Sequence, residues 1–254
     1  MFRQRPWTPT INKGGHSMES MNLNGQPYTA SMNQTESLGR YTAKTFGWMF
    51  AGLMLTFLIA LFGYSTGAVI YVFAVPYLYL ILGIAELFVV IFLSARIQKL
   101  SVGAARALFF TYAALNGVVF SAYFLIYVTA DLILAFGATS VFFGVMALIG
   151  YFTNADLSRL RNFLMGGLIF LLVFWIFAMF IDLSQFSTIA CTVGIFIFLV
   201  FTAYDTQKIR AYHTYYAQSP DMLAKASIFS ALDLYLDFIN LFLYLIRLLG
   251  RNRN

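Results

Sequence analysis

Apolar residues dominate this chain from about residue 44 onward, and short polar or charged stretches divide them into runs. The runs cover 44–64, 76–95, 105–128, 132–153, 163–181, 186–209 and 226–249. Because an α-helix rises about 1.5 Å per residue, most of these runs match the roughly 30 Å hydrocarbon core of a bilayer. The pattern predicts an all-α integral membrane protein built as a bundle of seven transmembrane helices.

The composition of the chain supports this fold class. Of 254 residues, 61% are hydrophobic and 10% are charged, whereas a soluble domain carries about 25% charged residues. The net charge of +6 could indicate a nucleic-acid partner, but the Lys and Arg residues lie in short clusters between apolar runs. We interpret them as topology signals, with the lipid bilayer as the partner and no nucleic acid.

The positions of the basic residues predict the orientation in the membrane. Lys and Arg border the start of the first run and then every second connection: Arg40, Lys44, Arg96, Lys99, Arg106, Arg159, Arg161, Lys208, Arg210 and Lys225. The alternate connections, 65–75, 129–131 and 182–185, contain none. Since cytoplasmic loops are enriched in Lys and Arg, the N-terminus is expected in the cytoplasm. A full seventh span puts the C-terminal arginines outside, and a re-entrant last segment is the alternative.

The first residues have a different character from the rest of the chain. Residues 1–40 are rich in Asn, Ser, Thr, Gly and Gln and lack an apolar core of signal-peptide length. They predict a disordered cytosolic tail ahead of a membrane domain over 41–254. His16 in the tail and His213 in a connection have no ligand cluster nearby, so we expect both to be solvated. The lone Cys191 excludes a disulfide within one chain.

Acidic residues inside the apolar runs are the candidates for function. The last run holds Asp233 and Asp237, and a carboxylate facing lipid costs several kcal/mol, so this helix should lie inside the bundle. Asp205 lies near the cytoplasmic end of the preceding run. Counting depth from the cytoplasmic ends favours Asp233 as the partner of Asp205. Because Asp237 follows four residues later on the same helix face, the spacing leaves both pairings open.

Two carboxyl groups that meet away from water share a proton, which makes a proton-sensitive latch. Arg96, at the cytoplasmic end of the second run, is the cation expected to stabilise the ionised pair. Glu86 lies ten residues before Arg96, and Arg247 lies ten residues after Asp237. If Arg96 reaches the latch, Glu86 and Arg247 can form a second ion pair further out. The alternative is that these charges only fix the packing register.

Four segments carry a resemblance to a known family. FLSARIQKLSVG, TYAALNGVVFSAYFLIY, FTAYDTQKIR and LYLDFINLFLYLIRLLG are similar to the bacterial branch of the Bax inhibitor-1 family, in order, over roughly residues 34–250. The resemblance implies a seven-helix fold whose last helix is surrounded by the other six. It also implies a pH-sensitive calcium leak across the cell inner membrane.

The resemblance also assigns roles to individual residues. It pairs Asp205 with Asp237 as the di-aspartyl sensor, and it makes Arg96 the gating cation. Because two or three carboxylates and water provide few ligands, we expect only a weak calcium site at Asp205 and Asp237. Asp233 is kept as a vestibule carboxylate. The helix-two Glu and the late helix-seven Arg of the family correspond to Glu86 and Arg247.

Other function classes fit the sequence less well. An intramembrane aspartyl protease would have its second Asp in a GxGD context followed by a PAL motif, and LYLDF around Asp237 has neither. No phosphate-binding glycine loop, metal-ligand His pair or nucleophile set stands out, so we expect no enzyme and no cofactor. The remaining alternative is an interaction protein that modulates a membrane-embedded quality-control protease or a stress or cell-death response, with its N-terminal tail as the docking element.

Overall fold

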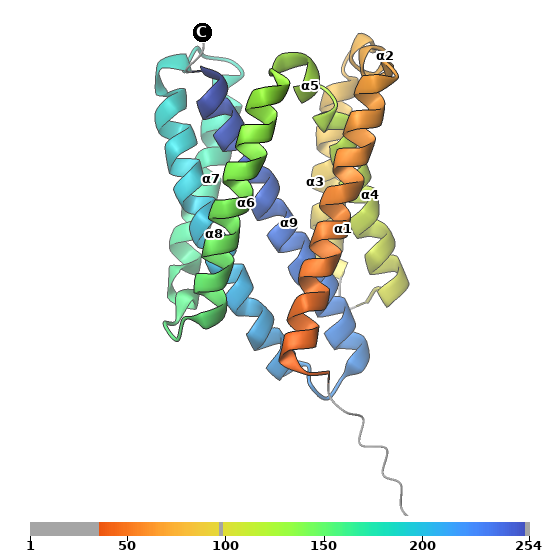
Figure 1. The fold of residues 1–254 in the computed structure, drawn as a ribbon, viewed down its shortest axis with the longest axis vertical. Helices are drawn as coiled ribbons and strands as arrows, with labels where there is room; N and C mark the ends of the chain where they lie inside the picture. The colour runs from red at the N-terminus through yellow and green to blue at the C-terminus, as the bar shows by residue number, and fades with distance from the viewer. Residues whose placement is uncertain (1–35, 97–98, 252–254) are drawn as a thin grey trace, which may run out of the picture. The chain divides into compact units, whose positions relative to one another are not determined.

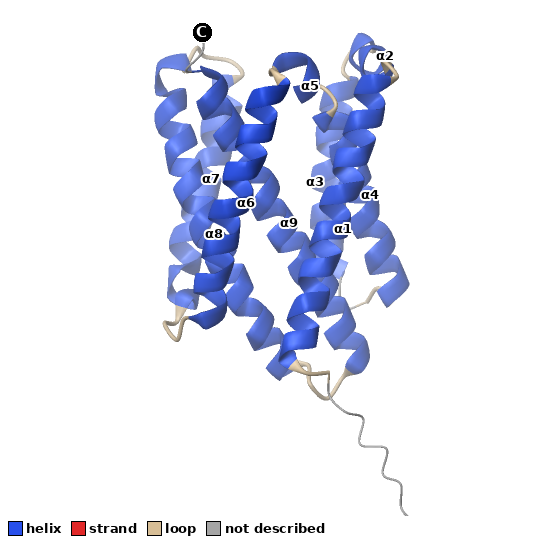
Figure 2. Ribbon diagram, viewed as in Figure 1, coloured by secondary structure: helices blue, strands red, loops and turns tan. Residues whose placement is uncertain are grey.

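The computed structural model describes residues 36–96 and 99–251. Helices make up every regular element in these two ranges, and no strand occurs in them (Figure 2). In chain order they are α1 (Leu38–Ser65), α2 (Ala68–Ala74), α3 (Leu78–Arg96), α4 (Val102–Phe120), α5 (Tyr123–Ile126), α6 (Thr129–Phe152), η1 (Leu157–Leu160), α7 (Arg161–Ala178), η2 (Ser184–Phe186), α8 (Ser187–Tyr215) and α9 (Pro220–Arg251). The all-α prediction is confirmed. Most of the predicted tail, including His16, lies outside the described residues. Its last residues do not fit the prediction of a tail over 1–40, because α1 begins at Leu38.

Six of these helical segments are long and apolar enough to cross a membrane. They are Leu38–Ser65, Val102–Ile126, Thr129–Phe152, Leu157–Ala178, Ser184–Tyr215 and Pro220–Gly250. The chain is therefore a multi-pass integral membrane protein. The predicted count of seven spans is not confirmed, because α3, with 19 residues, is not among the six.

Local sequence explains where several helices begin. The side chain of Ser37 accepts a hydrogen bond from the Arg40 amide at the start of α1, and Ser101 does the same for the Ala104 amide at the start of α4. Serine is a preferred residue at this position, since its oxygen satisfies an amide that has no partner within the helix. Pro220 begins α9, where its missing N–H is not needed.

The long helices run antiparallel to their chain neighbours (Figure 1). The connections 153–160 and 216–219 lie at the same end of the bundle as the start of α1. We call this the inner end, because the Lys and Arg bias assigns it to the cytoplasm. The connections 66–77, 121–128 and 179–186 lie at the outer end, where α9 also ends.

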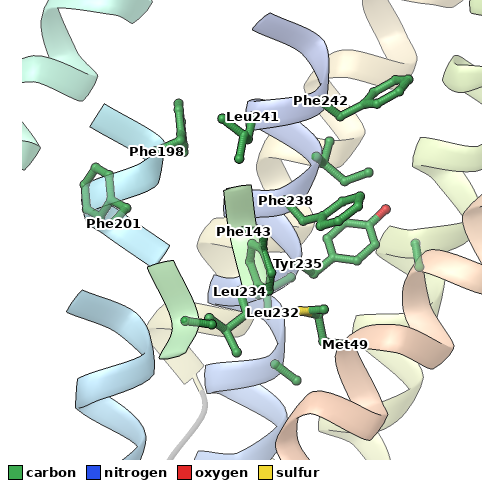
Figure 3. Packing of buried hydrophobic residues seen from close by; sticks show 14 of the residues in the cluster. Met49, Phe143, Phe198, Phe201, Leu232, Leu234, Tyr235, Phe238, Leu241 and Phe242 are labelled. Atoms are coloured by element: carbon green, nitrogen blue, oxygen red, sulfur yellow. The ribbon is translucent and has the colours of Figure 1, made fainter. Parts of the chain in front are cut away.

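The last helix is the most buried of the spans. In α9, 72% of the most apolar window is buried, against 11–44% in the other five candidate spans. It packs against α8, α1, α6 and α4, and Figure 3 shows side chains from these elements gathered around it. Leu234, Tyr235 and Leu241 are fully buried there. Asp233 and Asp237 of α9 therefore face protein rather than lipid, as the sequence predicts.

Small residues let α8 approach both of its main neighbours. A Cβ atom added at Gly150 of α6 would overlap the backbone carbonyl of Ala203 in α8. A Cβ atom added at Gly194 of α8 would come within 2.7 Å of the Tyr244 ring of α9. Close backbone contact of this kind is typical of helix packing in membranes. It holds the part of α8 that carries Asp205 against the rest of the bundle.

The connection between α8 and α9 is shorter than the sequence predicts. Both helices extend beyond their apolar runs, so the connection comprises only residues 216–219. His213 is therefore part of α8 and not a solvated loop residue. Its Nε2 lies 2.6 Å from the carbonyl oxygen of Glu36, and its ring lies 5.3 Å from that of Tyr41. The prediction for His213 is wrong because helix formation continues through the polar end of α8.

Candidate functional site: an acidic cluster between α8 and α9

The hairpin formed by α8 and α9 positions the acidic residues. The two helices pack against each other in opposite directions. Asp205 lies about ten residues before the end of α8, and Asp233 and Asp237 lie near the middle of α9. The short connection therefore brings the three side chains to a similar height within the inner half of the bundle. We call Asp205, Asp233, Asp237 and Lys208 the acidic cluster.

A lysine joins the two helices at this cluster. The Lys208 ammonium nitrogen lies 2.6 Å from Asp205 Oδ1 and 2.6 Å from Asp233 Oδ2. The three side chains are 20%, 8% and 17% exposed, respectively. Charge-assisted hydrogen bonds this short, shielded from water, are far stronger than surface ion pairs. Lys208 therefore ties α8 to α9.

Aromatic rings surround the same ammonium group. The Lys208 nitrogen lies 5.6 Å from the ring centre of Tyr204, 5.7 Å from that of Tyr212 and 5.6 Å from that of Phe229. A cation within about 6 Å of an aromatic face is attracted by the ring quadrupole. The rings therefore add to the two carboxylates in fixing the position of the ammonium.

Asp237 completes the cluster one helical turn beyond Asp233. It is only 4% exposed, and its charged neighbours are Asp205, Asp233 and Lys208, with Asp205 within side-chain hydrogen-bonding range. Its Oδ2 atom has no hydrogen-bond partner in the described part of the chain. Three carboxyl groups thus lie near one ammonium, which contacts two of them. If all three ionise, two negative charges remain uncompensated in a poorly hydrated space, which favours proton uptake.

The structure brings Asp205 together with both candidates from α9, but it does not bring Arg96 to them. Arg96 is exposed at the end of α3 and forms no ion pair with any residue of the two described ranges. The reason is the position of α3 in the bundle, because α3 packs mainly on α4 and has no extensive contact with α8 or α9. The bridge expected from Arg96 is formed here by Lys208.

The expected ion pair of Glu86 and Arg247 is also not formed. Glu86 lies beside Tyr112 and Tyr235, and its Oε1 is buried without a hydrogen-bond partner among the described residues. The Arg247 guanidinium lies 4.3 Å from the ring centre of Trp175 in α7. Because α9 crosses the bundle from the side of α1 to the side of α7, its outer end is far from α3 (Figure 1).

Lys208 is the residue that sequence reasoning missed. It was counted only as a topology signal at the inner end of the sixth apolar run. A signal was present in the segment YDTQK, because residues three apart on a helix lie on one face, so Lys208 can reach Asp205.

The cluster offers a cation two carboxylate oxygens at the place of the ammonium. Among the residues that the structure describes, no group of three His, Cys, Asp or Glu side chains has the geometry to hold a metal ion. Calcium in resident sites takes about six to eight oxygen ligands. The arrangement therefore suits transient contact with a passing cation better than storage of one.

Comparison with known proteins agrees with the resemblance found in the sequence. The family model described as "Inhibitor of apoptosis-promoting Bax1" matches residues 38–254. The inner membrane protein YbhL of Escherichia coli is 39% identical over 218 residues, which cover 85% of this chain and 93% of YbhL. An uncharacterised protein of Rickettsia prowazekii is 35% identical over 228 residues, 89% of this chain and 96% of its own. An uncharacterised Deinococcus radiodurans protein is 37% identical over 228 residues, 88% and 96% of the two chains. This chain, with its acidic cluster on the last two helices, belongs to the Bax inhibitor-1 family.

Proposed function

We propose that this protein is a pH-sensitive leak pathway for calcium and related cations, located in a bacterial inner membrane. The observation that carries the proposal is the buried acidic cluster, in which Asp233 and Asp237 of α9, the most buried candidate span, meet Asp205 and the Lys208 ammonium of α8. Ionisable residues inside membrane spans are rare, and they mark ion pathways and proton relays. The relative YbhL is named as an inner membrane protein, which supports the location.

The gating step follows from the charges that meet in the cluster. The groups that face one another are Asp205, Asp233, Asp237 and Lys208, with Tyr204 and Tyr212 at the ammonium. When the carboxylates are ionised, they hold Lys208 and so hold α8 to α9. Protonation removes this attraction and loosens the two helices. Acidification is therefore expected to open the pathway.

We also propose that α3 is a seventh span. Its 19 residues extend about 28 Å at a helical rise of about 1.5 Å per residue, close to the thickness of a hydrocarbon core. An odd number of spans agrees with the start of α1 and the end of α9 at opposite ends of the bundle (Figure 1). Reporter fusions after residue 36 and after residue 251 test this. Reporters active on the same side of the membrane would contradict it.

Flux measurements test the function itself. Purified full-length protein in liposomes that contain a calcium dye should leak calcium, and the leak should increase as the pH falls. Asp205→Asn should abolish the pH dependence, because it removes the carboxyl group that contacts both Lys208 and Asp237. Asp182→Asn is a matched control, since Asp182 is exposed in the outer connection between α7 and α8. An Asp205→Asn profile equal to that of the unaltered protein would contradict the proposal.

The proposal describes a passive pathway, neither an enzyme nor a cofactor-dependent protein. The alternative function, modulation of a membrane-embedded protease or of a stress response, depended on the N-terminal tail, and residues 1–35 lie outside the described ranges. Deletion of residues 1–34 separates the two functions, because partner binding would be lost while calcium flux stays intact.

A further inference from the structure

The Lys208 ammonium occupies a position that suits a metal cation. Its nitrogen is 2.6 Å from one oxygen of Asp205 and 2.6 Å from one oxygen of Asp233. Oxygen ligands bind calcium at about 2.3–2.6 Å, so a bare cation at the same point would have two carboxylate oxygens at suitable distances. A second observation also indicates a ligand. Asp237 is 4% exposed, and its Oδ2 next to the cluster has no hydrogen-bond partner among the described residues.

We infer that Lys208 is a tethered competitor for the cation position between Asp205 and Asp233, and that it makes the pathway select divalent over monovalent cations. The inference rests on the proposed cation leak and names the residue that determines its selectivity. An ion that passes the cluster must displace the ammonium, so the ammonium sets the minimum charge that an ion needs in order to enter.

Charge balance explains the preference. Two ionised carboxylates and one ammonium leave one negative charge uncompensated. A monovalent ion that replaces the ammonium restores the same balance, so it gains no Coulomb energy to offset displacement of Lys208. A divalent ion neutralises both carboxylates. Its attraction to each oxygen is twice as large at equal distance, and in a poorly hydrated site this difference amounts to several kcal/mol.

The displaced ammonium can reach water at the inner end of the bundle. Lys208 lies seven residues before the end of α8, which is about 10 Å from the inner end of the bundle. Its side chain is 20% exposed, and Tyr212 lies one turn closer to that end. A lysine stem of this length can carry its charge toward water while its methylene groups stay on apolar surface. Exchange between cation and ammonium at the cluster can therefore proceed by rotation of the Lys208 side chain.

The test is the ratio of calcium flux to potassium flux in vesicles that contain full-length protein. Lys208→Met keeps the unbranched shape and most of the length of the side chain and removes its charge, so potassium should enter freely and the ratio should fall at least about tenfold, the equivalent of about 1.4 kcal/mol. Lys208→Arg keeps the charge and should retain most of the preference. Because both fluxes come from the same vesicles, the ratio does not depend on how much of each variant folds.

The control is Lys44→Met, which removes one positive charge from the inner part of α1, where Lys44 contacts Glu36 at 3.4 Å. Its flux ratio should equal that of the unaltered protein. A ratio unchanged in Lys208→Met, or lowered equally in Lys44→Met, would overturn the inference even if the pH-sensitive leak is found.

A separate readout covers the case in which no variant conducts, which would refute the proposed leak. Calcium should then raise the unfolding temperature of the unaltered protein more than potassium at equal ionic strength, whereas both ions should stabilise Lys208→Met. Equal responses of the two proteins to potassium would overturn the inference independently of flux.

Discussion

Near the middle of α9, Asp233 and Asp237 meet a carboxylate and an ammonium from α8, whereas near its outer end Arg247 rests on the indole ring of Trp175. Both regions place charge inside a membrane domain. In the inner region one ammonium on the neighbouring helix α8 compensates part of the charge. In the outer region no carboxylate of the described residues forms an ion pair with Arg247, and an aromatic face takes that place.

The surroundings of the two regions explain the difference. The acidic cluster is enclosed by α8 and α9, so unbalanced charge there costs several kcal/mol per group. Arg247 borders a cavity of about 440 Å³ at the outer end, lined also by Tyr127 and Trp175. The Trp175 indole N–H donates to the Tyr244 hydroxyl at 3.1 Å, which fixes the ring under the guanidinium. Charge pairing is thus expected to matter for stability at the inner region and much less at the outer one.

Removal of Lys208 should have the largest effect on stability. Lys208→Met leaves Asp205 and Asp233 without their counter-ion, and loss of one partner of a buried pair costs about 3–5 kcal/mol. The loss in unfolding free energy should be smaller at pH 5 than at pH 8, because protonation neutralises the carboxylates. Denaturant unfolding in detergent at both pH values measures it. A loss that does not change with pH would show that charge is not the cause.

Removal of Arg247 should have a smaller effect. Arg247→Met deletes one cation–π contact, for which about 0.5–2 kcal/mol is expected. Arg247→Lys should recover part of this value, since it restores a positive charge over Trp175. The same unfolding measurement applies. A cost equal to that of Lys208→Met would remove the distinction between the two regions.

Removal of a buried hydrogen bond between uncharged groups should lower the stability less than removal of Lys208 or Arg247. Thr56 of α1 donates to the Ala113 carbonyl at 2.8 Å and lies 2.7 Å from the Tyr235 hydroxyl. Hydrogen bonds between membrane helices average about 0.6 kcal/mol, so Thr56→Val should lower the unfolding free energy by about that amount. Thr192→Val is the control, because Thr192 is exposed and, within the described ranges, its hydroxyl bonds only to the carbonyl of Thr188 in its own helix. An equal cost for both variants would contradict a stabilising contact between helices.

An exposed acid outside the spans should show the smallest effect. The pKa of Asp156, between α6 and η1, is lowered because the Ser158 hydroxyl and amide donate hydrogen bonds to its carboxylate. Ser158→Ala should move this pKa up toward its ordinary value. Since a lowered pKa adds stability above the unfolded-state value and loses it as the pH falls through the folded-state value, any change in stability should appear only in acid. Carboxyl chemical shifts measure it, and an unchanged midpoint would exclude the hydroxyl as the cause.

The helices could be predicted from the sequence because a membrane leaves the backbone few alternatives. Each apolar run must satisfy its own amide and carbonyl groups, which makes it a helix, and the alternation of loops then places Asp205 near the acids of α9. Which helices pack side by side could not be predicted. Counting residues gives the depth of Glu86 and of Arg247, but not that α3 packs on α4 while the end of α9 crosses toward α7. For the same reason, Arg96 was expected as the cation beside the aspartates, where the structure has Lys208.

The contact at Gly150 bears on which parts of the bundle can move. Backbone of α6 touches backbone of α8 beside Ala203, two residues before Asp205, with no side chain between them to absorb a displacement. α8 and α6 are therefore expected to move as one rigid unit. A transition between states then has to displace α9 or the helices on its far side. Gly150→Ala would add a methyl group that separates α6 from α8 at this contact and so shifts Asp205 without altering any charge.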